Sequence, residues 1–169
     1  PEKPYKWHDK KFDASKLGDL LIYEAHVGMA QEEAKVGTYN EFTKKILPRI
    51  KEAGYNAVQL MAIAEHPYYG SFGYHVSSFF APSSRFGTPD ELRSLVDRAH
   101  ELGIAVIMDL VHAHYVKNFD EGINELDGSP NLYSKAGEAG NQPHWDSKIF
   151  DYGKREVAHF LLSNVKYWL

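Results

Sequence analysis

An internal repeat constrains the fold of this chain more than any other feature of its sequence. Residues Gly37–Phe42 (GTYNEF) recur as Gly87–Leu92 (GTPDEL), and in each copy a threonine precedes a glutamate by three positions. This spacing is that of a helix capping box. Apolar residues at helical spacing follow both copies, and Gly54 and Gly103 stand where these helices should stop. The repeat therefore predicts two equivalent units, each with a capped amphipathic helix.

Short apolar runs alternate with the predicted helices. These runs are Leu20–Ala25, Ala57–Met61 and Ile104–Met108. A further helix comes last, with Val157, Phe160, Leu161, Val165 and Trp168 on one face. Nearly continuous apolar strands separated by helices are typical of a parallel sheet whose faces are covered. The strand–helix order, repeated three times, predicts an α/β fold, and Pro48 should kink the first helix or split it in two.

Three such units leave a parallel sheet with two open edges, which promote pairing with other chains. A (β/α)8 TIM barrel needs eight units and roughly 250 residues, whereas this chain has 169. We therefore interpret residues 19–169 as the first three βα units of a TIM barrel, truncated before the fourth strand. Residues 1–18 are polar and contain two prolines, so we interpret them as a lead-in from an upstream domain.

Composition argues against several other classes of protein. The net charge of −4 at pH 7 argues against a nucleic-acid partner, which would need a concentrated basic face. The apolar runs are too short for a membrane span, so we expect no membrane partner. The absence of cysteine excludes a disulfide scaffold and thiolate metal sites, and it favours a cytoplasmic location.

Two loops are much longer than a connection between neighbouring elements requires. They run from Ala62 to about Gly87 and from His112 to about Gly153, and each follows the carboxyl end of a predicted strand. Long loops inside compact domains are usually functional. Active sites of TIM barrels lie at the face where the strands end. The functional residues are therefore expected at the strand ends and in these two loops.

Three polar residues, Asp109, His112 and His114, follow the third predicted strand. An ionised carboxylate at the end of an apolar run is costly unless it is paired or used in a site. The alternative for Asp109 is a structural residue that closes the strand. The two histidines point to the same side if the chain stays extended. A His-x-His pair alone is a weak signal for zinc, and hydrogen bonding to a sugar or to the backbone is the alternative.

Aromatic residues in both loops offer surfaces for a planar or sugar-like ligand. Gly73 has no side chain to obstruct Tyr74, so this ring can lie flat against a ligand. The alternative is a loop that packs its aromatic rings onto the rim of the barrel. Trp145 has the same two interpretations. If exposed it can stack on a sugar, but we expect it to be buried and to fill the core of its loop.

Several segments together resemble the α-amylase-type glycoside hydrolase superfamily, and most closely its 1,4-α-glucan branching enzymes. Asp109–His114 resembles the first signature sequence of the superfamily, and Leu21–Gly28 resembles the start of the barrel in branching enzymes. Further similarity lies in Gln59–Ile63, Ser71–Tyr74, Arg85–Pro89 and Leu162–Leu169. The resemblance covers essentially the whole chain.

The resemblance implies a retaining transglycosylase that cleaves α-1,4 links and re-forms α-1,6 branches in glycogen or starch. It implies that Tyr74 stacks on the glucose ring in the −1 subsite. It also implies that Asp109 and His114 help to shape that subsite, with His114 bonded to a sugar hydroxyl. No cofactor and no metal are expected. Many amylases have a calcium-binding Asn at the position of His112, and an imidazole suits calcium poorly.

The same resemblance implies partners and sets a limit on catalysis by this chain. The partners are an α-1,4-glucan (glycogen, amylose or amylopectin) and the rest of the barrel with its flanking domains. Members of the family use two carboxyl groups about 5 Å apart, which follow the fourth and fifth strands. We therefore expect no catalytic residue in this chain, which alone should be inactive. The alternatives are another amylase-type hydrolase or debranching enzyme, a non-catalytic glucan-binding module, and a metal-dependent hydrolase using both histidines.

Overall fold

The computed structural model describes residues 3–169, which form two compact units. The first unit holds the residues up to Met61 together with Ser84–Asp109, and the second holds Ala62–Ser83 together with Leu110–Leu169. Each unit is thus built from two stretches that are separated in the sequence. The stretches after the second and third predicted strands, where the sequence places the functional residues, make up the second unit.

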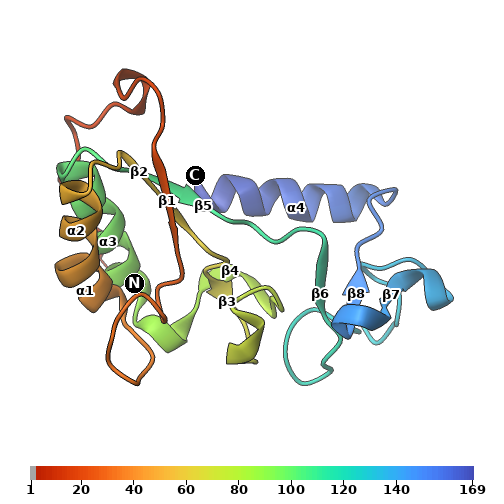
Figure 1. Ribbon diagram of the computed structural model, residues 1–169. Helices are drawn as coiled ribbons and strands as arrows, with labels where there is room; N and C mark the ends of the chain where they lie inside the picture. The colour runs from red at the N-terminus through yellow and green to blue at the C-terminus, as the bar shows by residue number, and fades with distance from the viewer. Residues whose placement is uncertain (1–2) are drawn as a thin grey trace. The chain divides into compact units, whose positions relative to one another are not determined.

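The first unit is built around a three-stranded parallel sheet, as the repeat predicts. Strand β1 spans Ile22–Ala25, β2 spans Ala57–Leu60 and β5 spans Ala105–Met108, in the order β1-β2-β5 (Figure 1). All three strands begin level with one another, because Ala57 pairs with both Ile22 and Ala105. Among the described residues β1 pairs with β2 alone, so its other edge has no strand partner.

The capping boxes form at both copies of the repeat. Helix α1 (Tyr39–Glu41) begins after Thr38, and helix α3 (Pro89–Glu101) begins after Thr88. At each start the threonine side chain accepts a hydrogen bond from the backbone N–H three residues on, and the glutamate side chain at that position bonds back to the threonine N–H. These reciprocal bonds satisfy two N–H groups that a helix start otherwise leaves unpaired.

The first helix is split, as Pro48 predicts. A π-helical segment, Phe42–Ile46, separates α1 from helix α2 (Leu47–Glu52), and Pro48 lies in the first turn of α2. A proline is tolerated there because the N–H that it lacks would be unpaired in any case. Gly54 follows α2 with a left-handed φ of +90°. Helices α1, α2 and α3 lie side by side next to the sheet (Figure 1).

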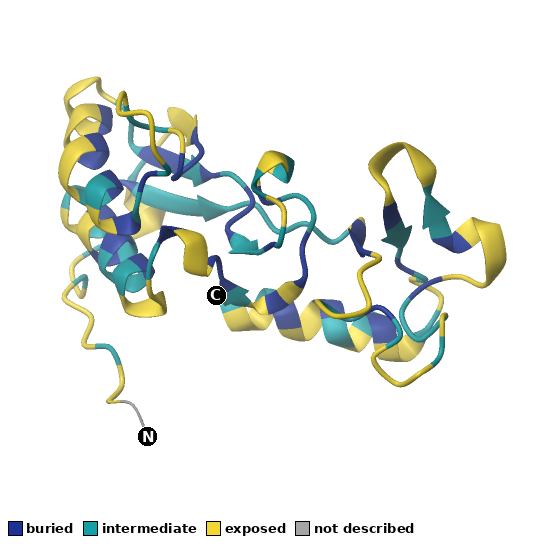
Figure 2. Ribbon diagram, turned by 90° about the horizontal axis from the view of Figure 1, so that it is seen from below, coloured by how far each residue is buried: buried dark blue, intermediate teal, exposed yellow. Residues whose placement is uncertain are grey.

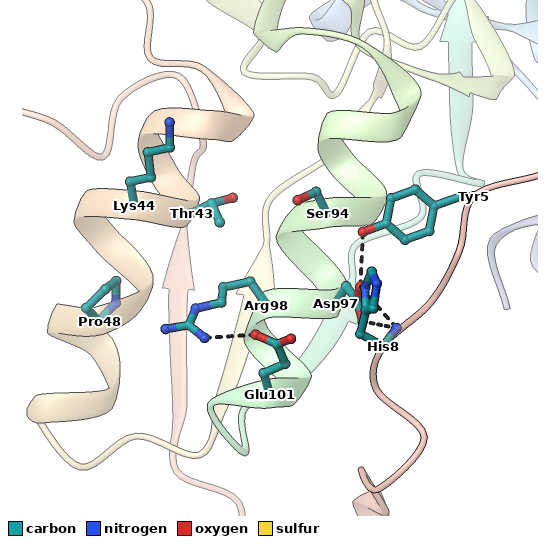
Figure 3. Close-up of a pocket in the computed structure, with 9 residues that line it drawn as sticks. All are labelled: Tyr5, His8, Thr43, Lys44, Pro48, Ser94, Asp97, Arg98 and Glu101. Atoms are coloured by element: carbon teal, nitrogen blue, oxygen red, sulfur yellow. Dashed lines mark hydrogen bonds and ion pairs between the residues drawn. The ribbon is translucent and has the colours of Figure 1, made fainter.

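The predicted lead-in packs on helix α3 through one buried carboxylate. Asp97 accepts hydrogen bonds from the Tyr5 hydroxyl at 3.0 Å and from the His8 backbone N–H at 2.9 Å. The Nδ1 atom of the His8 ring lies 2.8 Å from the same carboxylate. These side chains line a cavity of about 450 Å³ together with residues of α3 and of the split helix (Figure 3). Tyr5 and His8 therefore take part in the packing of the first unit.

The second unit contains antiparallel strands that the sequence analysis did not predict. Strands β3 (Ala64–Glu65) and β4 (Ser78–Pro82) pair with each other. Strands β6 (His114–Val116), β7 (Asn141–Gln142) and β8 (Ser147–Ile149) form a second antiparallel sheet in the order β6-β8-β7. The two long loops of the sequence analysis are therefore partly sheet. Strands of two to five residues are too short for alternation to reveal them.

Helix α4 (Arg155–Trp168) covers the core of the second unit with the face that the sequence predicts. Figure 2 shows buried and exposed positions alternating along this helix, which leads to the end marked C. The buried core that it joins consists of Val76, Phe79, Tyr115, Phe150, Val157 and Leu161. No helix within residues 3–169 combines the length and the apolar character that crossing a membrane requires.

Candidate functional site

The structure divides the three predicted substrate-binding residues between the two units. Asp109 directly follows β5 in the first unit, and its backbone N–H donates to the carbonyl of Leu60 at 3.3 Å. This bond extends the pairing of β2 with β5 by one step, so Asp109 lies at the strand end as predicted. Tyr74 and His114 both lie in the second unit. The large cavity beside Asp97 is lined by none of these three residues.

His114 begins strand β6 and is only 7 % exposed. Its Nδ1 lies 2.9 Å from the hydroxyl of Ser147, at the start of β8, and the ring of His75 lies 5.8 Å away at nearly a right angle. Burial lowers the pKa of His114 below its usual value, and the neighbouring His75 lowers the pKa further. The His114 ring is therefore held neutral at pH 7, and its Nε2 can donate a hydrogen bond to a sugar hydroxyl or accept one from it, according to the tautomer.

His112 has different partners from His114. Its Nε2 lies 2.7 Å from the side-chain oxygen of Asn164 on α4, and its carbonyl accepts a bond from the Tyr152 hydroxyl at 2.9 Å. Asn164 in turn donates to the carbonyl of Phe79 at 2.6 Å. Because β6 begins only at His114, the extended stretch that would orient both histidines alike does not include His112. Within residues 3–169, no three His, Cys, Asp or Glu side chains form a group able to hold a metal ion.

Tyr74 follows a turn with two left-handed residues. Phe72 and Gly73 have φ values of 55° and 95°, and the N–H of Tyr74 donates to the carbonyl of Ser71 at 3.0 Å. A Cβ atom on Gly73 would lie 1.8 Å from the carbonyl oxygen of Ala62. Gly73 is therefore required by a close backbone approach as well as by its φ. From the sequence we expect the missing side chain of Gly73 to leave room for a ligand, but in the structure the carbonyl of Ala62 occupies the position of that side chain.

The expectation that Trp145 fills the core of its loop is wrong. Trp145 lies between β7 and β8, it is 54 % exposed, and its ring centroid is 5.1 Å from that of His114. The antiparallel pairing of β6 with β8 creates this proximity, since it pairs Ser147, two residues after Trp145, with Val116, two residues after His114. The sequence shows an aromatic residue in a loop but carries no signal for the strand pairing that decides its exposure.

Two neighbours of His114 were missing from the predicted site. His75 directly follows Tyr74, and a histidine next to a candidate substrate residue is the sequence signal that could have identified it. Ser147 offers no such signal, because serines are common in loops and only the pairing of β6 with β8 brings its hydroxyl to the imidazole. The structure thus adds two residues around the histidine that the sequence selected.

Comparison with known proteins decides the family. Residues 21–152 match the family model of the alpha-amylase catalytic domain. This chain belongs to the alpha-amylase family. It is 54 % identical to the 1,4-alpha-glucan-branching enzyme of Yarrowia lipolytica, over 98 % of this chain and 24 % of that protein. The chloroplastic/amyloplastic 1,4-alpha-glucan-branching enzyme 2-2 of Arabidopsis thaliana is also 54 % identical, over 100 % of this chain and 21 % of its own length.

Solved structures of the alpha-amylase family share the fold. An alpha-amylase from Lactobacillus plantarum matches 88 % of this chain and 36 % of its own chain, with a TM-score of 0.73 and 25 % sequence identity. The parallel sheet of the first unit and the membership in this family together imply a fragment of a TIM barrel. The chain spans about a quarter of the length of the curated relatives that it matches.

Proposed function

We propose that this chain is the N-terminal part of the catalytic barrel of a 1,4-α-glucan branching enzyme. The observation that carries the proposal is the high identity, over nearly the whole chain, to proteins with that name. The full-length enzyme would cleave an α-1,4 link with retention and transfer the released chain to a 6-hydroxyl group, which forms an α-1,6 branch. Its substrate would be an α-1,4-glucan such as glycogen, amylose or amylopectin, and its role the synthesis of branched glucan.

In this proposal, Tyr74, Asp109 and His114 bind the glucose ring in the −1 subsite. The neutral ring of His114 supports this role: Ser147 holds Nδ1, so that Nε2 can bond to a sugar hydroxyl. A hydrogen bond of this kind strengthens when positive charge develops on the sugar ring in the transition state. The nucleophile and the general acid are proposed to lie in other parts of the full-length enzyme.

We further propose that residues 19–169 supply the first three βα units of the barrel and that residues 1–18 lead in from an upstream domain. The open edge at β1 supports this assignment, because closure of a barrel pairs such an edge with another strand. A cytoplasmic location is proposed from the absence of cysteine among the 169 residues. Fractionation of cells that express the full-length protein tests the location.

The decisive experiment incubates the full-length protein with amylose and measures two quantities. New α-1,6 links are counted by proton NMR, and new reducing ends are counted by a colorimetric assay. A branching enzyme makes α-1,6 links without a net gain of reducing ends. A gain of reducing ends without branches identifies a hydrolase, and loss of branches from glycogen identifies a debranching enzyme.

The same assay separates the remaining alternatives. Binding of glucan without any change in linkage identifies a non-catalytic module. The metal-dependent alternative requires that a chelator abolish turnover, whereas the proposed enzyme keeps its activity in chelator. Amylose incubated with buffer alone is the control. The protein itself is purified from a host strain free of amylase, so that no host enzyme contributes product.

A further inference from the structure

Trp145 lies at the tip of the hairpin that joins β7 to β8, in a segment whose backbone is well held. The tip begins with a 3-10 turn over Pro143–Trp145 and ends at Asp146, which has a left-handed φ of 50°. The carboxylate of Asp146 forms an ion pair with Lys117, just after β6. Pairing of β7 with β8 closes the other side of the tip. The indole is therefore presented from a folded turn.

An exposed tryptophan at the tip of a hairpin contributes little to the free energy of folding. Burial of a large aromatic side chain contributes most of its stabilising free energy, and the greater part of Trp145 remains accessible. The ring is nevertheless held beside the buried imidazole of His114, which Ser147 fixes from the other strand. This combination indicates a binding role.

The chemistry of the indole ring indicates the class of ligand that it binds. A pyranose has a face of C–H groups that packs on a flat aromatic ring, and its rim of hydroxyls needs polar partners. The side chains on either side of Trp145, His144 and Asp146, are both exposed and polar. In an α-1,4-glucan, any glucosyl unit that contacts His114 has covalently joined neighbours. The indole beside His114 is placed to meet one of these neighbours.

We propose that Trp145 is a stacking platform for a glucosyl unit of the α-1,4-glucan, adjacent to the unit that contacts His114. The proposal rests on the function proposed above, and it adds a binding residue that the resemblance to the family does not supply. Trp145 holds the glucan chain so that the neighbouring unit is presented to His114. It binds sugar, and it takes no part in moving protons.

The first test follows each tryptophan of the full-length protein by chemical oxidation. The protein is treated with N-bromosuccinimide with and without maltoheptaose, and oxidation at each residue is measured by peptide mass spectrometry. We expect ready oxidation of Trp145 without sugar and a several-fold lower rate when maltoheptaose saturates the protein. Trp7, which is 41 % exposed in the first unit, is the matched control and should react equally in both conditions.

Sorbitol at the same mass concentration controls for the polyol itself. Two results overturn the proposal. If Trp145 resists oxidation in the sugar-free protein, other parts of the polypeptide cover it. If it reacts equally with and without maltoheptaose, no glucan stacks on it. This readout needs no turnover, so a protein that makes no branches but shows protection contradicts the proposed function and not the stacking. Branching without protection contradicts the stacking alone.

The second test compares Trp145→Phe with Trp145→Leu in the full-length enzyme. Phenylalanine keeps a flat ring, whereas leucine keeps apolar packing against His114 without one. We expect Trp145→Leu to raise the KM for amylose about tenfold with little change in kcat, and Trp145→Phe to remain within about threefold of the wild type. Phe119→Leu, at a 72 % exposed aromatic residue of the same unit, is the control and should change neither constant.

The kinetic outcomes also decide between stacking and simple packing. Equal KM values for the two Trp145 variants and the wild type show that no flat ring is needed, which overturns the proposal. A fall in kcat at unchanged KM, with an altered pH profile, shows that Trp145 acts by positioning His114, which also overturns it. A raised KM in Trp145→Leu that Trp145→Phe restores supports stacking.

Discussion

The two units of this chain are stabilised in different ways. The first has parallel strands and helices whose starts and stops follow local sequence signals. The second has short antiparallel strands around an aromatic core, and it contains the three non-glycine residues with left-handed backbone found among residues 3–169: Phe72, Glu125 and Asp146. Such a backbone costs about 1–2 kcal/mol for most residues and less for aspartate, so tertiary contacts must hold Phe72 and Glu125. Because Phe72 lies two residues before Tyr74, the comparison indicates that the second unit accepts strain near a candidate binding residue.

Two histidines of the first unit also differ from two of the second in the side chains that they contact. In the first unit, His8 and His100 face the carboxylates of Asp97 and Asp9 at 2.8 and 2.7 Å. In the second, the partners of His112 and His114 are the neutral side chains of Asn164 and Ser147. Burial lowers the pKa of His114, which favours its uncharged form. His8 and His100 thus contact carboxylates of distant segments of the first unit, whereas the uncharged ring of His114 contacts a neutral hydroxyl and is suited to hydrogen bonding with a sugar.

The largest expected effect is that of Gly73→Ala in the second unit, with Gly54→Ala in the first unit as its control. Gly73→Ala should destabilise the full-length protein by more than about 4 kcal/mol, because its Cβ would overlap the Ala62 carbonyl. Gly54 has nearly the same φ as Gly73, but a Cβ atom on Gly54 would have no atom within 4 Å. Gly54→Ala should therefore destabilise the protein by only about 1–2 kcal/mol. Thermal melts of both variants test the difference. Equal falls in melting temperature would show that the close approach at Gly73 relaxes easily.

Next in size is the effect of the two candidate histidines on catalysis. His114→Ala should lower kcat/KM of the full-length enzyme about tenfold to a hundredfold, which corresponds to a hydrogen bond worth about 1.5–3 kcal/mol. His112→Ala should act mainly on stability, because it loses the bond to Asn164. Steady-state kinetics and melts of both variants, with and without chelator, check this. Equal kinetic losses with complete inhibition by chelator would favour a metal site instead.

Mild acid should destabilise the second unit through His114. Burial lowers the pKa of His114 in the folded state, so the unfolded chain takes up the proton first, and stability falls as pH drops below about 6.5, the ordinary pKa of histidine. His114→Gln should remove this part of the pH dependence. Denaturation of the wild type and the variant at a series of pH values between 7 and 5 measures the difference. Parallel curves would contradict the burial of His114 in the full-length protein.

Stronger acid should act on the first unit through Asp97. Burial raises the pKa of this carboxyl, but hydrogen bonds from His8 and Tyr5 outweigh burial and hold the pKa below its usual value. The stabilisation is therefore present above about pH 4, the ordinary pKa of aspartate, and is lost as pH falls through the lower folded value. Asp97→Asn should cost about 1.5 kcal/mol at pH 7 and show a weaker loss below pH 4. Asp90→Asn, on the exposed side of α3, is the control.

The smallest expected effect is that of the repeated caps. Thr38→Ala and Thr88→Ala should each destabilise the protein by about 1 kcal/mol, because each removes one side-chain bond to a helix N–H. Thr→Ser at either position keeps the hydroxyl and should restore most of the loss. Melting temperatures of the four variants test whether the two copies of the repeat are energetically equivalent.

The sequence by itself determined the first unit almost completely. A capping box, a proline in a first turn and a left-handed glycine act through bonds between residues a few positions apart, so the pattern around Thr38, Thr88 and Pro48 already contains its physical cause. The parallel order of β1, β2 and β5 follows from the strand–helix alternation. The sequence also selected Tyr74, Asp109 and His114 as candidate residues, through strand ends and through resemblance to a family to which the chain belongs.

Only the tertiary structure decided how the second unit surrounds those residues. The bond from His114 to Ser147 and the exposure of Trp145 both depend on the pairing of β6 with β8, two strands of three residues that are far apart in sequence. Strands this short carry no periodic signal, and the left-handed backbone at Phe72 opposes the local preference of that residue. Contacts between distant segments offset that local cost, and which segments contact each other is known only from the folded structure.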